Sequence, residues 1–95
     1  MEKLTVFYLE SCPYCQKAKR ALGELAAENA AYGSVPLDWI EESVQPEVAG
    51  LYDYYSVPSV FAGKEKLFET KISDSYEVIK ENMKAALDKA IASQG

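Results

Sequence analysis

Apolar side chains at the start of the chain lie on both faces of a predicted strand. Residues 3–9, KLTVFYL, are rich in β-branched and aromatic residues and carry no charge after Lys3. A continuous apolar run of this length is typical of a central strand that is covered on both sides. From residue 12 the apolar period becomes helical, with Gly33 placed to end a helix whose apolar positions are Cys15, Ala18, Leu22 and Leu25.

The middle of the chain predicts three further strands. Residues 35–42, VPLDWIEE, alternate apolar and polar side chains, which is typical of a strand with Trp39 in the core. Residues 56–63, SVPSVFAG, and residues 66–70, KLFET, flank a short turn. They predict a hairpin whose first strand begins at Pro58.

Two further helices are predicted after residue 45. Pro46 suits the first turn of a short helix, with Tyr54 left on the surface and an apolar face of Val48, Leu51, Tyr52 and Tyr55. Asp74, followed by Glu77, forms a capping-box-like start of the last helix. The apolar face of that helix consists of Tyr76, Ile79, Met83, Ala86, Leu87, Ala90 and Ile91.

The order of the predicted elements, β-α-β-α-β-β-α, indicates an α/β fold. Because crossover connections are right-handed, the three helices are expected to flank both faces of a four-stranded mixed sheet. Residues 1–95 are expected to form a single domain, since a chain of this length builds one core.

The charge balance and the N-terminal sequence exclude several classes of partner. Fifteen acidic and ten basic residues give a formal net charge of -5, which would repel a nucleic-acid backbone. The apolar stretch before Glu10 is too short for a signal peptide or a membrane span. We therefore expect a cytoplasmic monomer that binds neither nucleic acid nor a membrane. The chain has no histidine, which leaves cysteine as the obvious nucleophile.

Both cysteines of the chain stand at the start of the first predicted helix, in SCPYCQKAKR. Pro13 is favoured at the first helical position, which places Cys12 at the N-cap and Cys15 one turn further on. The free N–H groups of the first turn and the helix dipole can stabilise a thiolate at Cys12, so Cys12 is expected to be the attacking thiol. Cys15 shares the apolar face and is expected to stay protonated until it resolves the intermediate.

Other interpretations of the cysteine pair are less favoured. Two incidental core thiols do not explain the placement at a helix start in a reducing compartment. A zinc or iron–sulfur site needs four thiolate or imidazole ligands, and one chain offers two, so metal binding would require a dimer that shares cysteines. No metal site is predicted. Lys17 and Lys19 are treated as ordinary solvated side chains.

Two motifs resemble those of the glutaredoxin family. CPYC at 12–15, followed by QKAK, is similar to its active-site motif, and SVPSVF at 56–61 resembles its Thr-Val-Pro segment. Together with the element order, this resemblance covers nearly the whole chain and implies a thioredoxin fold. It also implies that Pro58 is cis and faces the cysteines.

The resemblance assigns roles to individual residues. It implies that Cys12 attacks a disulfide and that Cys15 resolves the mixed disulfide. Pro13 and Tyr14 would line the substrate site between the two cysteines. Val57, next to Pro58, would offer its backbone to a bound peptide or to glutathione.

The sequence departs from the family pattern where glutathione would bind. Leu9 and Glu10 occupy the stretch in which glutaredoxins carry a basic residue. Ser73 and Asp74 stand near the place of the family's Ser/Thr-Asp pair, but no glycine pair precedes them. Asp74 is thus a candidate ligand for the amino end of glutathione and is also a candidate helix cap, the role we favour. No tightly bound cofactor is expected, and glutathione is expected to be a weak reductant.

Two classes of function fit these observations. The first is a dithiol thiol–disulfide oxidoreductase that reduces protein or low-molecular-weight disulfides through CPYC, with a protein reductase or glutathione as electron donor. The second is a redox-sensing or partner-binding module with little turnover. The first is favoured, and disulfide-containing proteins are its expected substrates.

Overall fold

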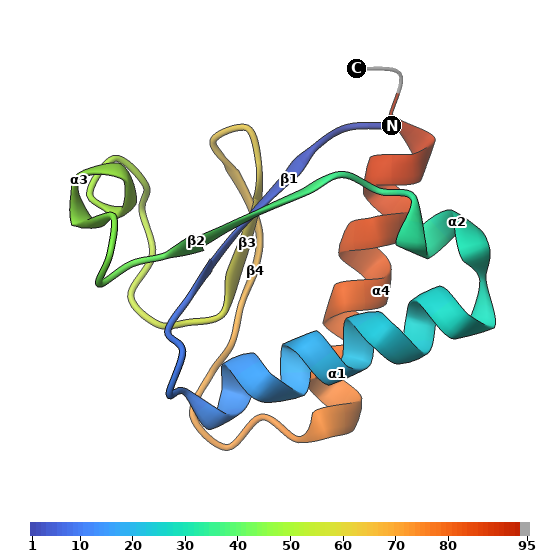
Figure 1. Cartoon of the computed structure of the whole chain (residues 1–95), viewed down its shortest axis with the longest axis horizontal. Coiled ribbons are helices and arrows are strands. Elements are labelled where there is room, and N and C mark those ends of the chain that lie inside the picture. Colours follow the sequence, from blue (N-terminus) through green and yellow to red (C-terminus); the bar gives the residue numbers. More distant parts are fainter. Residues whose placement is uncertain (94–95) are drawn as a thin grey trace.

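The central strand of the sheet is β1, Leu4–Tyr8, as its continuous apolar run predicts. In the computed structural model, which describes residues 1–93, β1 lies between β2, Leu37–Glu41, and β3, Ser59–Ala62 (Figure 1). The fourth strand, β4, Glu65–Glu69, forms the far edge. β1 pairs parallel to β2 and antiparallel to β3, and β3 pairs antiparallel to β4. The predicted four-stranded mixed sheet is confirmed.

The described part of the chain contains four helices, one more than predicted. α1, Pro13–Glu28, and α4, Tyr76–Ala92, pack on one face of the sheet, and α3, Pro46–Ala49, lies on the other (Figure 1). The first predicted helix is interrupted at Asn29, where extended backbone with φ -150° leads into α2, Ala30–Gly33. An asparagine side chain can cap a new turn in place of continuing the old one. Within residues 1–93, no helix is both long and apolar enough to cross a membrane.

The two faces of the sheet bury separate apolar clusters, and β1 contributes to both. Leu4 and Val6 point into the larger cluster, and Phe7 points into the smaller one. The larger cluster also contains Ala18, Leu25, Tyr32, Val35, Val60, Ala62, Ile79, Met83, Ala86, Leu87 and Ala90. The smaller cluster joins Phe7 to Ile40 and Phe61, with Val48, Ala49, Tyr52, Tyr54 and Val57 packed against it. Trp39, predicted in the core, is half-buried because β2 is an edge strand.

The short helix α3 ends earlier than its sequence period predicts. It closes at Gly50, so the helical spacing does not continue beyond that residue. Leu51 is 68% exposed and Tyr55 is 92% exposed, and the prediction that both are buried was wrong. Tyr54, expected on the surface, instead stacks on Phe7 with ring centroids 4.9 Å apart.

The last helix, α4, has a different cap from the one predicted. The hydroxyl of Ser75 accepts a hydrogen bond from the N–H of Val78, so Ser75 is the N-cap. The carboxylate of Asp74 instead accepts a bond of 2.8 Å from the N–H of Lys71. The predicted capping pair of Asp74 and Glu77 was therefore wrong, and Asp74 closes the turn that leads into α4.

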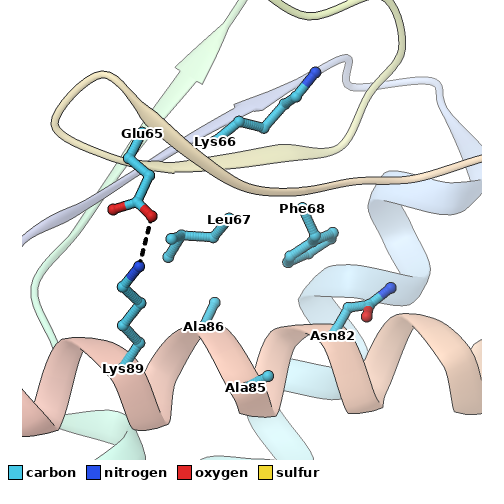
Figure 2. A pocket seen from close by; sticks show the side chains of 8 residues that line it. All are labelled: Glu65, Lys66, Leu67, Phe68, Asn82, Ala85, Ala86 and Lys89. Carbon is cyan, nitrogen blue, oxygen red and sulfur yellow. Dashed lines mark hydrogen bonds and ion pairs between the residues drawn. The ribbon is translucent and has the colours of Figure 1, made fainter.

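An irregularity in β4 lets two consecutive apolar side chains pack on α4. The pairing of β3 with β4 skips Leu67. Leu67 and Phe68 therefore both point toward α4, while Lys66 points away (Figure 2). Beside them, Glu65 and Lys89 form an ion pair of 2.7 Å at a cavity of about 220 Å³.

Glu69, the last residue of β4, fixes the segment that precedes Pro58. Its carboxylate accepts hydrogen bonds from the N–H groups of Tyr55, at 2.5 Å, and Ser56, at 2.6 Å, and pairs with Lys66 at 2.7 Å. Burial alone would raise the pKa of Glu69, but these contacts together lower it to about 2. The ionised carboxylate therefore stabilises the fold above its ordinary pKa of 4.5, and this stabilisation is lost as the pH falls toward 2.

We predict that Glu69→Gln lowers the free energy of unfolding at pH 7 by about 1.5–3 kcal/mol, the range for hydrogen bonds to a charged group. The difference from wild type should shrink as the pH falls below 4.5, where the unfolded carboxylate becomes protonated. Urea denaturation at pH 7 and in acid measures both effects.

The matched control is Glu65→Gln, which removes a more exposed ion pair from the same strand. It should cost less than about 1 kcal/mol. Equal losses in the two variants would contradict the role given to Glu69.

Candidate active site

The N-terminus of α1 and the carboxyl end of β1 place the cysteines at one end of the central strand. A tight turn joins the two elements, in which the N–H of Cys12 donates to the carbonyl of Leu9 at 3.1 Å. Cys12 is the N-cap of α1 and has extended backbone, and Pro13 holds the first helical position. The predicted helix start is confirmed. Pro13 is exposed beside Cys12, where an approaching molecule can touch it.

Cys15 lies one turn into α1 and is fully buried. Burial is the largest cause that raises the pKa of its thiol to about 12, and the neighbouring Cys12 side chain adds to the rise. The N–H of Leu9 donates to the Cys15 sulfur at 3.4 Å and acts in the opposite direction. Cys15 is therefore held as a neutral thiol at physiological pH, with one backbone donor already aimed at its sulfur.

Cys12 is the accessible member of the pair. It is half-buried, and both cysteines are free thiols in this structure. Its side chain forms no capping hydrogen bond within α1. The thiol instead donates to the carbonyl of Val57, with the sulfur and oxygen 3.8 Å apart. The segment before Pro58 is thus in direct contact with the half-buried Cys12.

The Val57–Pro58 peptide bond is cis, as the resemblance implies. Pro58 is buried, and its carbonyl accepts a hydrogen bond of 3.0 Å from the N–H of Thr70 at the end of β4. The structure therefore brings Cys12, Cys15, Val57 and Pro58 together from separate parts of the chain.

Tyr14 connects the cysteine motif to the turn before α4. Its hydroxyl accepts a hydrogen bond of 3.0 Å from the N–H of Ser73, which has a left-handed backbone with φ 73°. Lys17 lies over the Tyr14 ring at 5.2 Å from its centroid. The contact with Ser73 places the turn, and with it Asp74, beside the active-site helix.

The acidic side chains of Glu10 and Asp74 near the motif both have partners. Glu10 forms an ion pair of 3.5 Å with Lys19, whose ammonium group also lies 4.6 Å from the centroid of the Tyr8 ring. The carboxylate of Asp74 is engaged by the N–H of Lys71. Across residues 1–93, no group of three or more potential metal-ligating side chains converges.

Three contacts that shape this site were not predicted from the sequence. They are the Leu9 N–H toward Cys15, the Tyr14 hydroxyl toward Ser73, and the Glu69 carboxylate toward the chain before Val57. The last two join residues that lie far apart in sequence. No local pattern signals such pairs.

Structural comparisons place the fold among the thioredoxins. A malarial protein superposes with a TM-score of 0.59 at 16% identity, over 96% of this chain and 97% of that one. Thioredoxin 1 from Thermosipho africanus gives a TM-score of 0.58 at 13% identity, over 93% and 97% of the two chains. A single-residue mutant of a thioredoxin from Halobacterium salinarum gives 0.55 at 21% identity, over 87% and 72%. The predicted thioredoxin fold is confirmed.

The sequence comparison identifies the family. No curated protein sequence matches the chain significantly. The profile of the family described as Glutaredoxin, however, matches residues 4–67, more than half of the chain. The matched segment contains both cysteines and the Val57–Pro58 pair, and it supports a thiol redox function. The chain therefore belongs to the glutaredoxin family.

Proposed function

We propose that this chain is a dithiol thiol–disulfide oxidoreductase that reduces protein or low-molecular-weight disulfides. One observation carries the proposal. The accessible thiol of Cys12, at the N-cap of α1, lies beside the fully buried thiol of Cys15, whose pKa is raised to about 12. This difference gives the two sulfurs different tasks in one exchange reaction.

The reaction begins at Cys12. Its thiolate attacks one sulfur of a substrate disulfide, the S–S bond breaks, and the first substrate thiol leaves. Cys12 is then part of a mixed disulfide. Cys15 loses its proton, attacks the Cys12 sulfur, and releases the second substrate thiol. The substrate gains two electrons and two protons, and the protein keeps a Cys12–Cys15 disulfide.

The buried position of Cys15 orders these steps. A thiol with a raised pKa competes poorly for the substrate, and it reacts once the mixed disulfide has formed within its reach. The N–H of Leu9, 3.4 Å from the Cys15 sulfur, supports the negative charge that develops there.

The backbone of Val57 offers a binding site for the substrate next to Cys12. Its carbonyl lies 3.8 Å from the Cys12 sulfur. An extended peptide can bind such a segment by main-chain hydrogen bonds, as an added short strand. Such pairing would hold the disulfide of a protein substrate next to Cys12. Pro13 and Tyr14, together with Pro58, would line the same place.

The charges around the motif favour a protein reductant over glutathione. Glutathione carries two carboxylates, which bind best to basic side chains or free N–H groups. Leu9 is apolar, and Lys19 is paired with Glu10. Asp74, the candidate ligand for the amino end, already accepts a bond from Lys71.

We predict that Cys15→Ser accumulates a mixed disulfide with insulin, because nothing can resolve it. Cys12→Ser should form none and should show only background insulin reduction. Non-reducing electrophoresis and mass spectrometry of the acid-quenched reaction identify the adduct and its cysteine. A module that binds partners without turnover would give no insulin reduction in the wild type. An adduct on Cys15 in the Cys12→Ser variant would reverse the assigned roles.

We also predict that this protein reduces hydroxyethyl disulfide slowly when glutathione and glutathione reductase supply the electrons. Its turnover should be at least tenfold slower than that of a glutaredoxin with the full motif. The loss of one charge-assisted contact costs about 1.5–3 kcal/mol, or roughly 10- to 100-fold in affinity. Leu9→Lys should recover part of this loss. Ala85→Lys, which adds the same charge on α4, should not.

The same assay with a thioredoxin reductase as electron source tests the other reductant. Glutathione rates in the wild type that equal those of the reference glutaredoxin would show that the missing basic residue is unimportant.

A further inference from the structure

A pocket lies on the α3 side of the molecule. One of its lining residues, Tyr55, precedes Val57 by two residues in the chain. It has a volume of about 390 Å³. Three tyrosines line it together with one carboxylate, and the full lining is Glu42, Pro46, Ala49, Gly50, Tyr52, Tyr54 and Tyr55. Nothing in the reaction described above uses these side chains. We refer to it as the tyrosine pocket.

The lining of the tyrosine pocket is suited to a cation. Among the described residues that line it, Glu42 is the one charged side chain, and none is basic. The Glu42 carboxylate accepts a hydrogen bond of 2.7 Å from the Tyr54 hydroxyl, which fixes its position. Aromatic faces attract ammonium and guanidinium groups, and an adjacent carboxylate adds to that attraction.

One tyrosine of the tyrosine pocket, Tyr52, already binds a cation of the chain itself. The ammonium group of Lys64 lies 4.2 Å from the centroid of the Tyr52 ring, and it donates a bond of 2.7 Å to the carbonyl of Leu51. Tyr55, by contrast, is 92% exposed. The exposed Tyr55 ring lines the same pocket as the Glu42 carboxylate and is available to a second, external cation.

The connection to the redox site runs through the backbone. Glu69 binds the N–H groups of Tyr55 and Ser56, so the chain that leads from the pocket to Val57 is held in place. Two residues of chain span at most about 7 Å. A peptide bound along Val57 would therefore carry a nearby side chain to Tyr55.

We propose that the tyrosine pocket binds an arginine or lysine side chain of the substrate, close in sequence to the cysteine that Cys12 attacks. The inference rests on the proposed function and adds a substrate class to it, namely disulfides flanked by basic residues. The overall charge of -5 acts in the same direction.

The test uses pairs of short disulfide-linked peptide dimers that differ only in an arginine or a glutamine. The arginine is placed one, two or three residues before or after the cysteine. The pre-reduced protein of residues 1–95 is mixed with each dimer, and the reaction is quenched with acid. The second-order rate of Cys12–Cys15 disulfide formation is measured by mass spectrometry. The reaction needs no other reductant, because the protein dithiol supplies both electrons.

At the best position, the arginine peptide should react about five- to tenfold faster than its glutamine partner, as expected for one partly exposed cation site. A neighbouring arginine also makes a peptide thiol a better leaving group. The readout is therefore the arginine preference, which is the ratio of the rates of the arginine and glutamine peptides, and how it changes between variants.

Glu42→Gln and Tyr55→Leu should each reduce the arginine preference to less than half of its wild-type value. Glu42→Gln keeps an acceptor for Tyr54, and Tyr55 is too exposed to be needed for folding. Glu81→Gln, which removes the same charge on α4, should leave the preference as in the wild type.

An equal preference in the wild type, Glu42→Gln and Tyr55→Leu would overturn the inference while leaving the proposed function intact. A loss of preference in Glu81→Gln as large as that in Glu42→Gln would also overturn it, because net charge and not the pocket would be the cause. Failure of every peptide to oxidise the protein would refute the proposed function, and the inference with it.

Discussion

The redox site depends on one constraint, which is that α1 begins directly after the buried central strand. Because Pro13 starts the helix at the carboxyl end of β1, Cys12 stays accessible while Cys15, one turn later, lies in the interior. Two chemically identical thiols thereby acquire different environments, and burial affects the pKa of Cys15 more than any neighbouring charge does. Removing a thiolate from water is costly, so Cys15 is held neutral. Every step of the proposed exchange follows from this asymmetry, and the contact between Cys12 and Val57 adds the place where a substrate can lie.

Local sequence patterns predict the parts of this structure that local physics determines. The continuous apolar run of residues 3–9 identifies the central strand, because only a strand covered on both faces has no polar alternation. Proline identifies the start of α1, since its fixed φ and missing N–H suit the first helical turn. The cis bond at Pro58 could not be predicted from local physics, and it came from the resemblance of a short motif to a known family.

Prediction from the sequence fails where two local conformations are both favourable, and where residues far apart in the chain come into contact. At Asn29 the helical period continues, but a side chain that caps a new turn interrupts the helix. Asp74 and Ser75 are both good caps one position apart, and the preceding turn decides between them. Tyr55 is exposed because the period extrapolated for α3 stops at Gly50. The bonds that fix the active-site loops join residues far apart in the chain, which no window of sequence contains.

The different environments of the two thiols can be tested by following the ionisation of Cys15. In the Cys12→Ser variant Cys15 is the remaining thiol, and the NMR chemical shift of its labelled Cβ can be followed against pH. Cys15 should stay protonated through pH 9, because burial, the largest cause of its raised pKa, is unchanged by the substitution. A Cys15 that titrated near pH 8.5, like an ordinary free cysteine, would contradict the assignment of Cys15 as the buried resolving thiol.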